Sequence, residues 1–121
     1  MTDEARKAAG RRKGRGTAPR TGGVFTLLVE VGRRPDDGLP AGATGAGLLC
    51  YAAGRDEAEA VRETVKLIRE AGLAPLDVAS HGTLEDRLAA GEEIPEEGRA
   101  LMARAEAENA VVVAATEAFT D

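Results

Sequence analysis

Apolar and polar residues between positions 56 and 70 repeat with the 3.6-residue period of a helix that is buried along one face. Asp56 suits the N-cap position, and Glu59 follows three residues later, as in a capping box. The predicted apolar stripe consists of Ala58, Val61, Val65 and Ile68. Gly72 can take the left-handed conformation that ends a helix, and Pro75 prevents the helix from continuing.

Four segments have the composition of strands. Residues 24–31 and 75–81 alternate between two faces, whereas 46–53 and 110–116 are almost continuously apolar. The stretch 32–45 is rich in glycine and proline, so it predicts a long loop that joins the first two strands as a hairpin. Residues 84–90 suit either a short helical turn, with Thr83 as N-cap and Gly91 as its end, or a loop. A second main helix is expected to begin near Pro95 and to end at Asn109.

This β-β-α-β-α-β order predicts an α+β fold, a two-layer sandwich with a four-stranded mixed sheet. Because strand-helix-strand crossovers are almost always right-handed, we expect the two main helices to cover one face of the sheet. The opposite face would still present apolar residues such as Val24, Leu28 and Ala79. Such a face is too apolar for water, so the sequence predicts a homodimer that buries it.

Charge divides the 121-residue chain into two parts. Residues 1–23 have no apolar periodicity and are expected to form a flexible basic arm, whereas 24–121 has the size of one domain. The arm has seven basic residues against two acidic ones, and the remainder has nine basic against nineteen acidic ones. The basic residues of the arm are Arg6, Lys7, Arg11, Arg12, Lys13, Arg15 and Arg20.

The arm could contact nucleic-acid phosphates or an acidic partner without sequence preference. It contains no aromatic residue on which bases could stack, and the acidic body would repel nucleic acid. A nucleic-acid-associated protein is therefore one alternative, and a solubilising leader is another.

His81 is the only histidine and the main candidate for acid–base chemistry. Asp77 lies on the same strand face, but four residues of strand separate the two by roughly 13 Å, which is too far for a hydrogen bond. Glu85 or Asp86, one helical turn later, could reach the imidazole. The alternative is a histidine at a strand end that faces solvent or a subunit interface.

No other residue pattern predicts a catalytic or cofactor site. Cys50 is the only cysteine and lies in an apolar strand, which is typical of a buried structural thiol. The glycine-rich stretches 10–17 and 42–47 lack the strand and helix context of phosphate-binding loops. Acidic clusters at 92–93 and 96–97 suit a solvated helix start. We expect no metal and no cofactor.

The chain has no membrane-length apolar stretch and no signal-peptide pattern, so we expect a cytoplasmic protein without membrane contact.

From Phe25 onward the chain resembles the small ferredoxin-like (α/β plait) proteins. The segment AAGRDEAEAVRETVKLIREAGL and the ending AEAENAVVVAATEAF carry this resemblance together with the strands 24–31 and 75–81. The strict family order is β-α-β-β-α-β, whereas two strands precede the first helix here. Such domains include sensors, adaptors and small isomerases, and no catalytic residue is implied by the resemblance.

These observations favour a non-enzymatic binding or regulatory domain that acts through protein–protein contacts. A small isomerase-like acid/base enzyme that uses His81 with Glu85 or Asp86 is the alternative from another class. A nucleic-acid-associated protein that uses the basic arm is the third.

Overall fold

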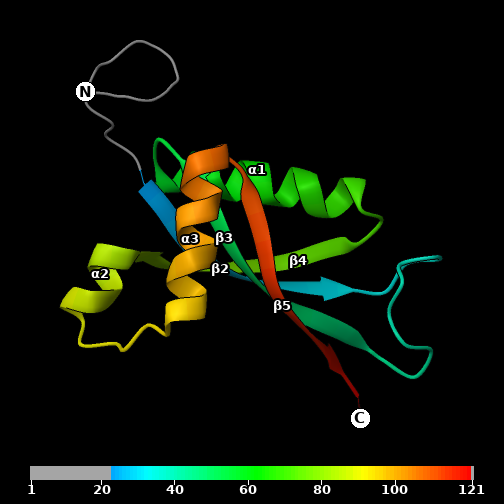
Figure 1. The fold of residues 1–121 in the computed structure, drawn as a ribbon. Coiled ribbons are helices and arrows are strands. Elements are labelled where there is room, and N and C mark those ends of the chain that lie inside the picture. Colours follow the sequence, from blue (N-terminus) through cyan, green and yellow to red (C-terminus); the bar gives the residue numbers. More distant parts are fainter. Residues whose placement is uncertain (1–22, 121) are drawn as a thin grey trace.

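The computed structural model describes residues 23–120, which form a four-stranded open sheet with three helices (Figure 1). The elements follow the chain in the order β2 (Gly23–Gly32), β3 (Gly45–Gly54), α1 (Glu57–Glu70), β4 (Ala74–Thr83), α2 (Leu84–Ala89), α3 (Glu96–Glu108) and β5 (Val111–Phe119). The fold is therefore α+β, and two strands precede the first helix as predicted. No helix in the described part of the chain is long and apolar enough to cross a membrane.

The sheet is antiparallel throughout, with the strand order β4-β2-β3-β5. The hairpin of β2 and β3 occupies the centre, in a continuous register from Gly23 opposite Gly54 to Val31 opposite Ala46. The prediction of a mixed sheet was wrong. The strands that are joined through helices are not neighbours in the sheet: β4 pairs with β2 and β5 pairs with β3, both antiparallel.

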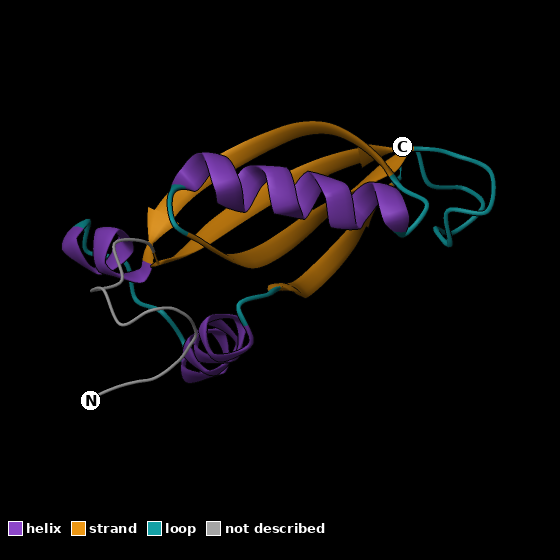
Figure 2. Ribbon diagram, turned by 90° about the horizontal axis from the view of Figure 1, so that it is seen from above, coloured by secondary structure: helices purple, strands orange, loops and turns teal. Residues whose placement is uncertain are grey.

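Helix α1 covers the first face of the sheet (Figure 2). Its N-cap is Asp56, whose carboxylate accepts from the backbone N–H of Glu59 at 2.8 Å. At its other end Gly72 has a φ of 88°, and the N–H of Leu73 donates to the Ile68 carbonyl, which completes a Schellman motif. Both predicted ends are therefore confirmed.

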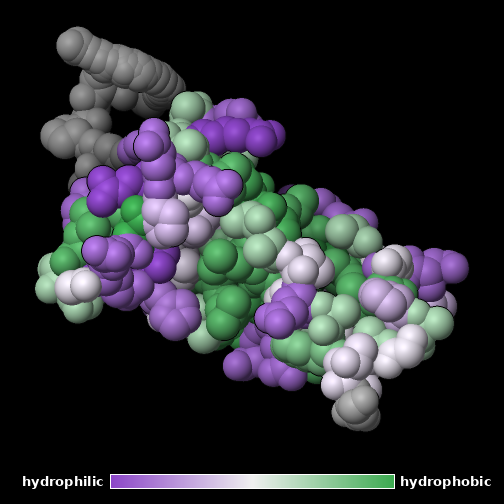
Figure 3. Space-filling model, turned by 60° about the horizontal axis from the view of Figure 1, so that its bottom comes forward, coloured by the Kyte–Doolittle hydropathy of each residue, from purple (hydrophilic) through white to green (hydrophobic). Residues whose placement is uncertain are grey.

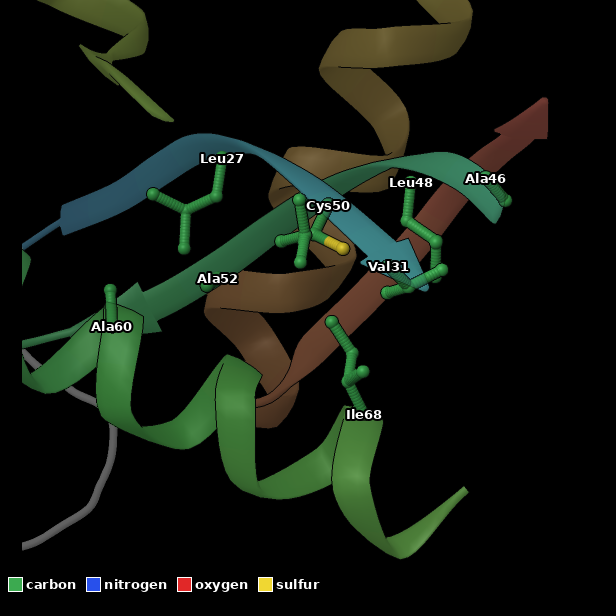
Figure 4. Packing of buried hydrophobic residues seen from close by; sticks show 9 residues of the cluster. Leu27, Val31, Ala46, Leu48, Cys50, Ala52, Ala60 and Ile68 are labelled. Atoms are coloured by element: carbon green, nitrogen blue, oxygen red, sulfur yellow. The ribbon is translucent and has the colours of Figure 1, made fainter. Parts of the chain in front are cut away.

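The buried side of α1 is rotated from the predicted stripe. Ala60, Thr64 and Ile68 are the buried residues, whereas Ala58 is exposed. Thr64 is accommodated in the core because its hydroxyl donates to the Ala60 carbonyl at 2.8 Å. Ala60 and Ile68 point from α1 toward the strands, whose Leu27, Leu48 and Cys50 belong to the same buried cluster (Figure 4).

Helix α3 packs on the second face, opposite α1. Its Met102 and Ala105 form a separate cluster with Tyr51 of β3 and Ile94. Tyr51 follows Cys50 in the same strand, so the two side chains point to opposite faces of the sheet, and Cys50 belongs to the cluster under α1. In Figure 4 the strands separate α1 from α3. The two layers formed by α1 and the sheet are as expected, but the placement of both main helices on one face was wrong.

Strand direction explains the helix placement. β3 and β4 both run antiparallel to β2, so α1 is a crossover between parallel strands, to which the right-handed rule applies. β4 and β5 run in opposite directions at the two edges of the sheet, and the rule does not constrain that connection. The chain therefore crosses the second face through α2 and α3, at the end of the sheet where β4 ends and β5 begins.

Helix α2 begins with a capping box and is fixed against the second face by a hydrogen bond to strand β2. The Thr83 hydroxyl accepts from the Asp86 N–H, and the Asp86 carboxylate accepts from the Thr83 N–H at 3.0 Å. Arg87 donates to the hydroxyl of the buried Thr26 on β2 and forms an ion pair with Glu92. These contacts hold α2 over the start of β2.

The loop between β2 and β3 is held by Asp37. Its carboxylate accepts from the Arg33 guanidinium at 2.9 Å and from the backbone N–H groups of Arg34 and Leu39. The hydrogen bond from Arg33, followed by those from the two backbone groups, holds the pKa of Asp37 far below its usual range. The long glycine-rich loop is therefore held by the Asp37 carboxylate together with Arg33, whose guanidinium also donates to the carbonyls of Pro40 and Ala43.

Candidate protein-binding surface

The second face is covered by helices at one end only, and its other end presents an apolar row across all four strands. In register, Ala79 of β4 lies opposite Leu28 of β2, Leu28 lies opposite Leu49 of β3, and Leu49 lies opposite Ala115 of β5. Directly opposed residues share a face of the sheet. Leu28 is 45% exposed, Ala79 and Ala115 are exposed, and Leu49 is half-buried against the α3 cluster.

An acidic row lies next to the apolar row. Asp77 of β4 is opposite Glu30 of β2, Glu30 is opposite Gly47 of β3, and Gly47 is opposite Glu117 of β5. All three carboxylate residues are exposed. Two residues of strand separate the rows, which is a rise of about 7 Å. We call the two rows together the open surface.

Gly47 leaves a gap in the middle of the acidic row, and the ring of Phe119 leans over it. A Cβ built on Gly47 would lie 3.2 Å from Cζ of Phe119. Phe119 itself is 39% exposed. The open surface thus includes an accessible aromatic ring between the carboxylates of Glu30 and Glu117.

Some of the solvent-exposed residues of the open surface are hydrophobic, among them Leu28 and Phe119. Figure 3, with the bottom of Figure 1 brought forward, shows hydrophobic surface through the middle of the molecule with hydrophilic groups beside it. Single exposed apolar residues are ordinary, but a row of them in register on a sheet face is typical of an interaction site.

The structure places His81 near the end of β4, where it is exposed. No side-chain hydrogen bond or ion pair joins it to another residue within 23–120. Of its two candidate partners, Asp86 is engaged in the capping box of α2, and Glu85 is exposed in the first turn of that helix. The acid–base pair predicted from the sequence stays a prediction.

Cys50 is fully buried between β2, β3 and α1. Desolvation raises the pKa of its thiol to about 11. A thiol in this state is protonated at neutral pH and is not a nucleophile. This is the structural role that the apolar strand predicted.

The acidic residues at the start of α3 do not form a metal site. Glu92 is paired with Arg87, and Glu96 lies with Arg99 in a shallow groove that also includes Ile94 and Ala100. Among the residues that the structure describes, no group of three or more His, Cys, Asp or Glu residues could hold a metal ion. The basic arm with its seven Lys and Arg residues, predicted as a contact for nucleic acid or an acidic partner, lies outside the described residues.

The chain belongs to a family whose function is not known. Residues 24–120 match the family described as Domain of unknown function (DUF8846), which covers all but the first of the residues that the structure describes. No curated protein and no solved structure matched the chain. The family assignment therefore names no ligand, partner or reaction, and the geometry of the open surface is the main guide to function.

Some residues of the open surface could be predicted from the sequence. Leu28 and Ala79 were placed on the apolar second face from their positions in the strands, and Asp77 from its place beside Ala79. The rows themselves depend on the register between β2, β3, β4 and β5, which period-2 alternation does not give. Sequence reasoning therefore missed that Glu30, Asp77 and Glu117 share one line across the sheet.

Proposed function

We propose that this protein is a non-enzymatic binding or regulatory domain of the cytoplasm that acts on another protein through its open surface. The single observation that carries the proposal is the apolar row centred on Leu28 and Leu49, which no element of residues 23–120 covers completely. Protein partners provide apolar side chains that match such a row, whereas a small molecule needs a concave site.

What supports a binding role over an enzymatic one is the lack of a convergent polar site within 23–120. The thiol of Cys50 is buried and protonated, Asp86 is committed to a helix cap, and the groove beside Arg99 is shallow. Enzyme sites bring an acid, a base or a nucleophile to one enclosed point. The polar groups of this domain are instead spread over its surface.

The proposal is tested by placing a photocrosslinking amino acid at position 28 in the full chain, with position 63 on the outer side of α1 as the control. Both positions are exposed, and they lie on opposite faces of the sheet. We expect the position-28 protein to crosslink in its native cell to one defined partner, and Leu49→Ser in the same chain to abolish that product. Equal products from positions 28 and 63 would refute a role for the open surface.

A homodimer is also part of the proposal. Helices α2 and α3 cover one end of the second face, so only the open surface is left there for the face-to-face contact that the sequence predicts. Strand β5 supports self-association independently: it is an edge strand with Val113 42% exposed and Phe119 39% exposed, and its one charged residue is Glu117. Such edges pair readily with a second strand. Light scattering at micromolar concentration should give twice the chain mass, and a monomer would exclude the homodimer.

A further inference from the structure

The acidic row has an energetic cost within the fold. Glu30 and Asp77 are directly opposed on neighbouring strands, which brings their Cβ atoms to about 5 Å, and like charges in this position are destabilising. Among residues 23–120 no Lys or Arg forms an ion pair with either of them or with Glu117. In this part of the chain the arginines that form ion pairs, at positions 33, 55, 87 and 104, all pair with other carboxylates.

The negative charge of the acidic row favours some binding partners of the open surface over others. A second copy placed face to face would bring the same three carboxylates against its mate. Nucleic acid would be repelled for the same reason. A protein segment with Lys or Arg beside an apolar residue complements both rows at once.

We propose that the open surface binds a basic segment of a partner protein, with an apolar side chain on the row of Leu28 and Leu49 and Lys or Arg on the row of Glu30, Asp77 and Glu117. This inference rests on the proposed binding function and names the chemistry of the partner. The exposed ring of Phe119 beside Gly47 adds a second contact for a cation, because aromatic rings attract ammonium and guanidinium groups.

The spacing of the rows defines the segment further. A rise of about 7 Å between the rows equals two residues of an extended chain, so alternate residues of an extended partner would meet the two rows in turn. The apolar and the basic residue must therefore be two positions apart, with both side chains on the same side of the segment.

The experiment uses the full chain and labelled peptides that repeat Leu-Ser-Lys-Ser, with Leu-Ser-Glu-Ser and Ser-Ser-Lys-Ser repeats as matched probes. Fluorescence anisotropy at low salt should show binding of the first probe only, and this binding should weaken steeply as salt is added. The row variant is Glu30→Gln with Asp77→Asn. The control variant is Glu63→Gln with Glu70→Gln, which removes the same charge from exposed positions on α1.

We expect the row variant to lose about tenfold in affinity for the Leu-Ser-Lys-Ser probe, and the control variant to keep the affinity of the native chain. The row variant should also melt at a higher temperature than the native chain, since the opposed carboxylates no longer repel. A melting temperature that falls would mean that the carboxylates have a structural role and would overturn the inference.

Each remaining outcome separates the inference from the binding function. Equal weakening in the row and control variants would mean that only net charge matters, and the inference fails. Equal binding of the lysine and glutamate probes would also overturn it, while the apolar row would stand as a binding surface. If Leu28→Ser leaves all affinities unchanged while the row variant loses affinity, the apolar row has no part in binding. The proposed function then fails together with the apolar half of the inference, and only the contact between the acidic row and a basic segment stands. Absence of lysine-probe binding at low salt overturns the inference.

Discussion

The two faces of the sheet differ in how completely they are closed. The first face is covered by the fourteen-residue helix α1 and contains Leu27, Val29 and Cys50, all fully buried. The second face is covered by α2 and α3 at one end only, and Leu28 remains 45% exposed at the other. The same central strand β2 supplies both sets of side chains. The difference shows that α1 closes the first face over the central strands, whereas the second face is closed only where α2 and α3 cover it.

The largest contrast is expected between Ile68 and Leu28. Ile68→Ala removes a buried side chain under α1 and should lower the free energy of unfolding by about 2–5 kcal/mol. Leu28→Ala removes a half-exposed side chain and should cost less than about 1 kcal/mol. Urea denaturation of the two variants measures both values. Similar losses would show that the second face is as much a part of the core as the first.

A smaller effect is expected from the cluster under α3. Met102→Ala removes a buried side chain next to Tyr51 and should cost about 2–3 kcal/mol, because the open side of this cluster allows some relaxation. Amide exchange should show the loss of protection first in α3, while α1 keeps its protection. Simultaneous loss in both helices would contradict two separate clusters.

Removing the N-cap side chain of α1 or of α2 should lower the stability of the fold by a still smaller amount, and the two variants can be compared directly. Asp56→Ala and Thr83→Ala each remove a side chain that accepts a backbone N–H at a helix start, and each should cost about 1 kcal/mol. The Asp56 variant should lose exchange protection on the first face, and the Thr83 variant on the second. Thermal melts with amide exchange distinguish the two, and a loss on the wrong face would contradict the assignment of these helices.

The smallest effect concerns pH and the loop that joins the two central strands. Asp37 has a depressed pKa in the folded state, so its stabilising contribution is present above its unfolded pKa of about 4 and is lost as the pH falls below that value. Asp37→Asn should therefore reduce the decline of the melting temperature between about pH 4 and pH 2. An unchanged pH profile would exclude Asp37 as the residue that holds the loop.

The elements of this fold could be read from the sequence because their signals are local. Asp56, Gly72 and Thr83 mark helix ends by the hydrogen bonds and φ angles that they provide, and all three have these roles in the structure. The burial of Cys50 could also be predicted from its apolar neighbours.

The buried side of α1 could not be predicted in this way. Thr64 is accommodated in the core because its hydroxyl donates to the Ala60 carbonyl, and the pattern of apolar residues cannot show that hydrogen bond.

The sequence by itself determined the order of the elements and the helix caps, since the signals for each depend on neighbours within a few residues. The domain bounds 24–121 stay a prediction. The antiparallel pairing, the separation of α1 from α3 and the two rows of the open surface were decided only by the tertiary structure. They depend on which strands become neighbours and in what register. A shift of one residue between β2 and β4 would move Glu30 and Leu28 out of line with Asp77 and Ala79, although the sequence would be unchanged.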